Sequence, residues 1–205
     1  MAVTSLKLPG KRAGERAEEI IDAAAAVFAA RGFHGASTQD VADRLGMRQA
    51  SLYYYFSSKE AMLERICLRS VGDFTGRAAG ISSGPGTAAE KLASLIRNHL
   101  VPGEERPDYV RCFLREQRFL PIESRRRIGR ASRRYERIFQ DVIEAGMAAG
   151  TLRRGLDARL ATLAILGMCN ASVNWYGKEP DASIGRISSA FTALVIDGLA
   201  ARKGS

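Results

Sequence analysis

Three consecutive tyrosines, Tyr53, Tyr54 and Tyr55, lie just before Lys59 in a segment that is predicted to be a short helix. Successive residues of a helix are turned by about 100° from one another, so three adjacent rings fan over more than half of its circumference and at least one ring must leave the core. An outward tyrosine offers an apolar ring and a hydroxyl that can reach a phosphate or a base edge. The segment therefore predicts contact with nucleic acid, although Tyr53 and Tyr55 could instead fill a small core with nearby phenylalanines.

Two short helices joined by a tight turn are expected to position these residues. Ser37 and Asp40 have the spacing of a capping box, Gly46 ends the helix that they begin, and a second helix is predicted over residues 48–56. Such a pair matches a helix-turn-helix, whose second helix enters the major groove of DNA. The side chains expected to contact DNA are Ser37, Thr38, Arg48, Gln49, Ser51, Tyr53, Tyr54, Tyr55 and Lys59. Among these, Arg48 and Gln49 suit guanine and adenine edges, and Ser37 and Thr38 suit a phosphate at a helix N-terminus.

The same segment resembles the N-terminal signature of the TetR family of bacterial transcriptional regulators. The resemblance covers about residues 16–64 and rests on Gly32-Phe33, Ala36–Ala42, Leu45–Met47, Leu52–Phe56 and Ser58–Glu60. It implies a three-helix DNA-binding domain, a helical ligand-binding and dimerisation domain, and a homodimer on a near-palindromic DNA operator. Arg48 and Tyr55 stand where the family often has serine and histidine, so the operator sequence stays open.

The chain of 205 residues is 46% hydrophobic and shows helical periodicity without strand-type alternation of useful length. We expect an all-α fold of about nine helices. A flexible basic arm is expected at residues 1–14, the helix-turn-helix domain at 15–60 and the effector and dimerisation domain at 61–205. A capping signal at Ser57 and Glu60 is expected to open the helix that links the two domains. No signal-peptide core or membrane-length apolar run occurs, and the three cysteines are widely spaced, so a cytoplasmic protein with buried thiols is expected.

Two apolar helices are predicted near the C-terminus, at about residues 157–176 and 184–202. In the family that the N-terminal segment resembles, the last two helices form a four-helix dimer interface. The residues that we expect there are Leu163, Gly167, Ala171, Ile187, Phe191, Leu194 and Val195. The alternative is that this apolar face belongs to the core of a single chain.

The positive charge of the chain is concentrated in residues 106–137, which carry 11 arginines against four acidic residues, while the whole chain has a net charge of +9. Arginine clusters bind phosphates and carboxylates through their forked geometry. Together with an apolar cavity they indicate an amphipathic anionic effector such as an acyl-CoA thioester. The side chains expected to bind it are Phe74, Phe113, Arg115, Phe119, Arg130, Phe139, Asn170, Asn174 and Trp175. A solvated arginine face and a lipophilic drug-like effector are the alternatives.

The sequence contains two histidines and none of the common metal, phosphate-loop or nucleophile-elbow motifs, so neither an enzyme nor a cofactor is expected. The predicted function is a repressor that a small effector releases from DNA. An architectural DNA-binding protein without an effector and a thiol-based redox sensor are the alternative functions.

Overall fold

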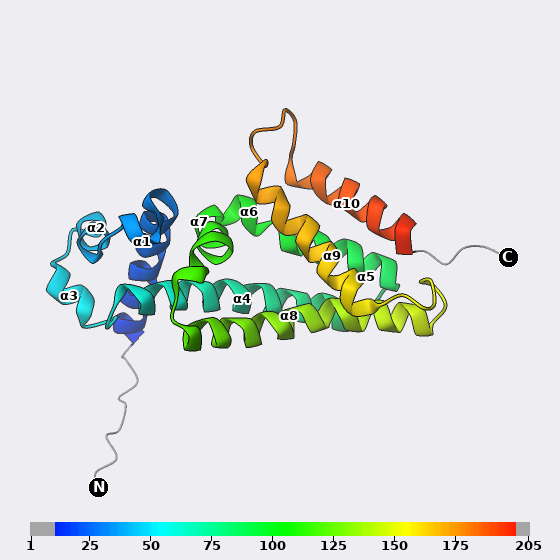
Figure 1. The fold of residues 1–205 in the computed structure, drawn as a ribbon, viewed down its shortest axis with the longest axis horizontal. Coiled ribbons are helices and arrows are strands. Elements are labelled where there is room, and N and C mark those ends of the chain that lie inside the picture. The colour runs from blue at the N-terminus through cyan, green and yellow to red at the C-terminus, as the bar shows by residue number, and fades with distance from the viewer. Residues whose placement is uncertain (1–10, 200–205) are drawn as a thin grey trace, which may run out of the picture.

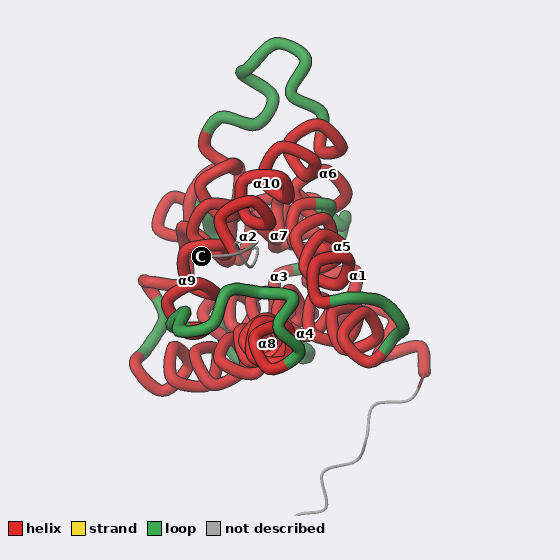
Figure 2. Tube along the Cα trace, turned by 90° about the vertical axis from the view of Figure 1, so that its right-hand side faces the viewer, coloured by secondary structure: helices red, strands yellow, loops and turns green. Residues whose placement is uncertain are grey.

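The computed structural model describes residues 11–199, which form ten α-helices with short π- and 3₁₀-helical turns between them (Figure 1). Figure 2 shows the same residues as helices and loops, with no strand in the described part of the chain. The all-α expectation is confirmed. No described helix is both long enough and apolar enough to span a membrane.

The N-terminal unit contains α1 (Lys11–Gly35), α2 (Thr38–Arg44) and α3 (Gln49–Tyr53). Regular helix in α1 stops at Gly32, where φ is 72°, a conformation that glycine adopts without strain. Ser37 caps α2 by accepting a hydrogen bond from the Asp40 backbone N–H, and the Asp40 carboxylate accepts one from the Ser37 backbone N–H at 2.8 Å. The predicted capping box is therefore present, and these hydrogen bonds lower the pKa of Asp40.

Helix α4 (Lys59–Ser83) runs from this unit into the rest of the molecule, and α8 (Ile122–Ala148) lies beside it in the same direction (Figure 1). Glu64 on α4 accepts hydrogen bonds from Ser124 and Arg127 on α8, and these bonds lower its pKa. The N-cap of α4 is Ser58, which accepts from the Ala61 N–H at 3.1 Å, so the expected capping by Ser57 is wrong.

The segment between α4 and α8 is broken into several pieces, whereas the apolar periodicity of residues 107–120 predicts one continuous helix there. It comprises α5 (Ala88–Leu100), α6 (Pro102–Glu105), α7 (Pro107–Arg111), a π-helical turn (Cys112–Glu116) and a 3₁₀ turn (Gln117–Phe119). Pro102 and Pro107 each stand at the first position of a helix, where the missing N–H costs nothing but a preceding helix cannot continue.

The C-terminal layer consists of α9 (Ala158–Ala171), a 3₁₀ turn (Ser172–Asn174) and α10 (Ile184–Leu199). Helix α9 packs against α5 and α8, and α10 packs against α5 (Figure 1). The same layer is seen from another side in Figure 2. Buried apolar side chains form two clusters, one around α1–α3 and one between α5, α8, α9 and α10. All three cysteines are buried in these clusters, and burial raises the pKa of Cys112 and of Cys169 to about 12.

The expected arm at residues 1–14 is only partly addressed by the structure. Residues 1–10 lie outside the described part of the chain. Residues 11–14 belong to α1, so this helix includes the last residues of the segment that was expected to be a flexible arm.

Candidate DNA-binding surface and effector cavity

The surface of α3 and of the turn after it carries exposed polar and aromatic side chains. Tyr53 is 49% exposed and Tyr54 is 82% exposed, and Arg48 and Ser51 are also exposed. Because α3 ends at Tyr53, the three tyrosines do not share one helix as expected. Tyr54 lies in the following turn, and Tyr55 is half-buried against the N-terminal core, with its ring edge-on to Tyr54 at 5.2 Å.

Thr38, Gln49 and Tyr53 form a hydrogen-bonded link between α2 and α3. The Gln49 amide nitrogen donates to the Thr38 hydroxyl at 2.6 Å, and the Thr38 and Tyr53 hydroxyls are 3.2 Å apart. Thr38 is only 9% exposed and its hydroxyl is hydrogen-bonded within the protein, so its contact with a phosphate stays a prediction. The link holds α3 at a fixed angle to α2, and Gln49 keeps its amide oxygen and its second amide N–H for a base.

Lys59 also has a structural role, and its expected contact with a phosphate stays a prediction. Its ammonium donates to the Phe33 carbonyl at 2.6 Å and to the Ala36 carbonyl at 2.8 Å, and it lies 4.4 Å from the Phe33 ring centroid. It therefore fastens the start of α4 to the connection between α1 and α2, which positions the whole N-terminal unit on α4.

A cavity of about 720 Å³ lies among α4, α5, α7, α8 and α9. Phe74, Phe113 and Asn170 line it, as expected from the sequence. Further lining side chains that were not expected include His99, Arg111, Gln117, Ser132, Tyr135, Glu136, Leu163, Leu166 and Cys169. A cavity of this size with mainly apolar walls and a few polar groups is typical of a small-molecule site.

One wall of the cavity carries three linked polar side chains, Tyr135, His99 and Asn170. His99 Nδ1 is 3.0 Å from the Tyr135 hydroxyl, and His99 Nε2 is 3.0 Å from Asn170 Oδ1. The Phe74 ring stacks on His99 with centroids 5.4 Å apart. Burial lowers the pKa of His99 and raises that of Tyr135, so both side chains are uncharged at neutral pH.

Six other residues expected at the effector site do not line this cavity. Phe139 is fully buried behind Tyr135, and Phe119 packs on Phe33 and on His34 near the N-terminal unit. Trp175 packs against Phe191. The remaining three are exposed: Arg115, which donates to Asn174 at 3.1 Å, Asn174 itself, and Arg130. Aromatic and basic residue types alone did not distinguish core and surface positions from cavity positions.

The arginines of α8 differ in whether they form ion pairs and with which residues. Arg127 binds Glu64 on the neighbouring helix, and Arg126 and Arg137 pair with carboxylates on their own helix. Arg130 and Arg133 are exposed and have no ion pair among the described residues. Arg133 directly follows Ser132, which lines the cavity, but Arg133 itself is not among the lining residues.

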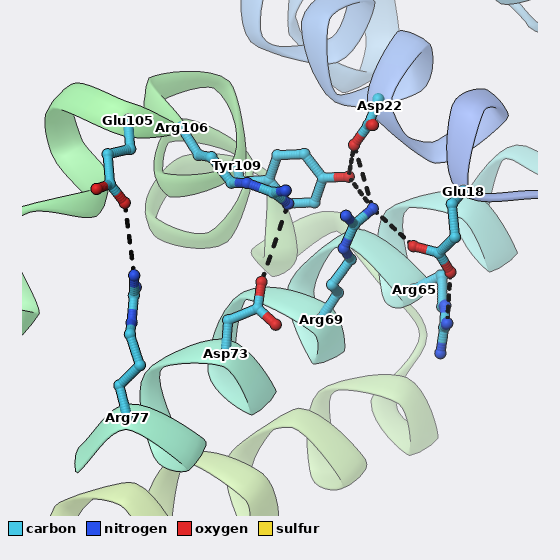
Figure 3. A network of polar contacts seen from close by, with 9 residues as sticks. All are labelled: Glu18, Asp22, Arg65, Arg69, Asp73, Arg77, Glu105, Arg106 and Tyr109. Atoms are coloured by element: carbon cyan, nitrogen blue, oxygen red, sulfur yellow. Dashed lines mark hydrogen bonds and ion pairs between the residues drawn. The ribbon is translucent and has the colours of Figure 1, made fainter. Parts of the chain in front are cut away.

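A polar network joins the N-terminal unit to the cavity region (Figure 3). The Tyr109 hydroxyl on α7 donates to the Asp22 carboxylate on α1, and it accepts from Arg69 Nη1 on α4 at 2.9 Å. Arg69 also pairs with Glu18 on α1 at 2.6 Å. Val110 and Arg111, the two residues after Tyr109, line the cavity. One short helix therefore contacts both the cavity and α1.

The residues expected at a dimer interface divide into two groups. Leu163 (43% exposed), Gly167, Ala171 and Leu194 (66% exposed) lie on the surface, and Leu163 and Gly167 also border the cavity. Ile187 and Val195 are buried in the core of their own chain, and Phe191 is half-buried on Trp175, so these three do not form an exposed face. The apolar face of α10 is wide because part of it covers the chain's own core.

Comparison with known proteins places both halves of the chain. A family model for the C-terminal domain of tetracycline repressor-like proteins matches residues 85–199, and a model for bacterial regulatory proteins of the TetR family matches residues 20–66. The fatty acid metabolism regulator protein of Bacillus subtilis is 29% identical over 184 residues, which cover 88% of this chain and 94% of that protein. The HTH-type transcriptional repressor KstR2 of Rhodococcus jostii is 26% identical over 186 residues, covering 90% and 91% of the two chains.

A solved structure shows the same fold along most of its length. The transcriptional regulator FadR from Bacillus subtilis, in complex with stearoyl-CoA, superposes with a TM-score of 0.78 at 27% identity and covers 88% of this chain and 98% of its own. With matches to both domain models of one family, the chain belongs to the TetR family of bacterial regulatory proteins.

Proposed function

We propose that the protein is a transcriptional repressor that binds a near-palindromic operator as a homodimer and is released by an acyl-CoA thioester. The observation that carries this proposal is that α7 borders the 720 Å³ cavity and also holds α1 through Tyr109. A ligand that fills the cavity presses on the same short helix that fixes the DNA-binding unit.

The DNA-binding part of the proposal rests on the exposed side chains of α3 and its turn. Arg48 and Ser51 can reach base edges, and the Tyr53 and Tyr54 hydroxyls can reach the phosphates on either side of the major groove. Because the Thr38 and Lys59 side chains both make hydrogen bonds within the fold, we propose that Thr38 positions α3 and that Lys59 positions the start of α4 against the connection between α1 and α2.

The effector part rests on the cavity and on the relatives. Apolar walls suit an acyl chain, while Arg111 in the wall suits the phosphates of a coenzyme A nucleotide. A related regulator of fatty acid metabolism has been solved with stearoyl-CoA bound. An acyl-CoA thioester combines the apolar and anionic parts that this site calls for.

The dimer part rests on the exposed apolar side chains of the C-terminal layer. Leu163, Gly167 and Ala171 follow one face of α9, and Leu194 is exposed on α10. Exposed large apolar groups together with small residues allow two helix pairs to approach closely around a two-fold axis. The dimer would set the spacing of the two α3 helices on consecutive major grooves.

Release is then a shift between two populations of the dimer. The effector favours the population in which the two α3 helices no longer match the operator, and no catalytic step is involved. The repressor works in the cytoplasm, where its operator lies.

The test is a measurement of operator affinity with and without effector. An operator is first selected from random-sequence duplexes with the full-length protein, and its dissociation constant is then measured by fluorescence anisotropy with stearoyl-CoA. We expect the thioester to weaken binding at least tenfold, while free coenzyme A and free stearate have little effect. Operator affinity that no acyl-CoA of any chain length changes would contradict the proposal, and release by uncharged lipophilic compounds alone would favour a drug-responsive repressor.

A further inference from the structure

The cavity wall contains three polar side chains, Tyr135, His99 and Asn170, that a purely hydrocarbon ligand cannot hydrogen-bond. They come from α8, α5 and α9, and they meet inside the cavity through two hydrogen bonds of 3.0 Å. A buried polar group that loses water without gaining a partner destabilises the state that buries it. A plain alkyl chain lying against this wall would have that effect.

The direction of the hydrogen bonds shows which group is left without a partner. A neutral histidine donates from one ring nitrogen and accepts at the other. Since Asn170 Oδ1 faces Nε2, the proton lies on Nε2, and Nδ1 accepts from the Tyr135 hydroxyl. The Asn170 amide nitrogen then has no hydrogen-bond partner among residues 11–199. The opposite amide orientation would reverse both bonds and free the Tyr135 hydroxyl proton instead, so either orientation presents an unpaired donor to the cavity.

From this geometry we propose that Asn170, held by His99 and Tyr135, makes the protein specific for an acyl group that carries an uncharged oxygen along its chain, as a ketone or a hydroxyl. The oxygen accepts the unpaired hydrogen bond that a saturated chain leaves unmade. Because the three side chains are uncharged and His99 is stacked under Phe74, the wall offers a neutral oxygen its partner without offering a carboxylate a counter-ion. This inference rests on the proposed acyl-CoA response and adds the chemical class of the acyl group.

The test compares matched thioesters on the full-length protein. Dodecanoyl-CoA and a series of oxo-dodecanoyl-CoAs, each with its ketone at a different carbon, are titrated calorimetrically. Satisfying one buried donor is expected to tighten binding by about tenfold to a hundredfold for the ketone position that reaches Asn170. In the Asn170→Leu variant that preference should fall to within about twofold.

Controls separate the possible outcomes. Asn174→Leu removes the same side chain from an exposed position outside the cavity and should keep the wild-type preference. Asn170→Ser serves as a second variant in case leucine disturbs folding. Equal binding of plain and oxo chains by the wild-type protein overturns the inference but leaves the proposed function intact, as does a preference that survives both Asn170 variants. If no thioester binds at all, the proposed function fails, and the inference fails with it.

Discussion

Replacing Tyr109 with phenylalanine tests whether the cavity communicates with the DNA-binding unit through α7. The change removes one hydroxyl and leaves the ring between the guanidinium groups of Arg69 and Arg106, each 5.3 Å from its centroid. Burial, and after it the hydrogen bond to Asp22, raises the pKa of Tyr109, so the wild-type hydroxyl is protonated at every physiological pH. The variant therefore loses the hydrogen bonds to Asp22 and Arg69 and little else.

The free energy that the Tyr109 hydrogen bonds contribute depends on how exposed their partners, Asp22 and Arg69, are to solvent. A buried hydrogen bond to a charged group contributes about 1.5–3 kcal/mol. The Asp22 side chain is 56% exposed, so solvent screening reduces each bond here to about 1 kcal/mol. If both bonds differ between the two states of the dimer, their loss removes about 2 kcal/mol of coupling, which corresponds to about thirtyfold in an equilibrium constant.

The assay measures the ratio of operator dissociation constants with and without saturating stearoyl-CoA. Tyr109→Phe should lower this ratio by threefold to about thirtyfold, and by linkage it should lower the effect of operator DNA on thioester affinity by the same factor. The matched control is Glu105→Gln, which breaks an exposed ion pair between α4 and α6 in the same network without touching α1 (Figure 3). A ratio that stays within twofold of wild type in Tyr109→Phe, or that falls equally in Glu105→Gln, would refute the coupling of the cavity to the DNA-binding unit through Tyr109.

Four further outcomes are expected. Tyr54→Ala, at an 82% exposed position, should weaken operator binding by about fivefold to tenfold. The thermal midpoint of unfolding should not fall, because the variant loses a contact with DNA that the free protein does not make. A lowered midpoint would indicate a role in folding instead. His99→Phe should flatten the pH dependence of the free energy of unfolding. Burial lowers the pKa of His99 in the native protein, so the contribution of this side chain to stability is present above about pH 6.5 and is lost as the pH falls. Denaturant titrations from pH 7 to pH 5 would detect the change. Gly146→Ala should destabilise the fold by about 1–3 kcal/mol, because the new Cβ would lie 2.6 Å from Leu152 Cδ1, and a thermal midpoint equal to that of wild type would contradict the close packing. Leu163→Glu should convert the dimer to a monomer in light scattering at micromolar concentration, whereas an unchanged mass would place the interface elsewhere.

The sequence was most informative where structure depends on neighbouring residues. The capping box joins Ser37 to Asp40 over three residues, and the positive φ at Gly32 and Gly46 ends α1 and α2, so the helix-turn-helix could be predicted with nearly correct boundaries. The same reasoning correctly predicted that Tyr54 lies outside the core, but it assigned Tyr54 to the second helix. Helix α3 ends at Tyr53, one residue before Tyr54. Short-range rules predict which helices form better than they predict where each helix ends.

The cavity could not be predicted in the same way, because its polar wall depends on packing between distant segments. His99 is 36 residues from Tyr135 and 71 residues from Asn170, and no local spacing relates them. The arginines of α8 show the same limit, because Glu64, the partner of Arg127, is 63 residues away along the chain. Only the packed fold distinguishes an arginine that ties two helices together from one that is available to a ligand.

The breaks in the chain between α5 and α8 give a physical reason for α7 to move. Helix α7 has five residues, begins at Pro107 and is followed by a π-helical turn, so it has few hydrogen bonds of its own and its position depends mainly on what it packs against. On one side it packs against the cavity through Val110 and Arg111, and on the other it is bonded to Asp22 and Arg69 through Tyr109. Helices α4 and α8, with 25 and 27 residues, are too long and too extensively packed to respond in the same way. We therefore expect an effector to displace α7 first, and α1 to follow through its bond to Tyr109.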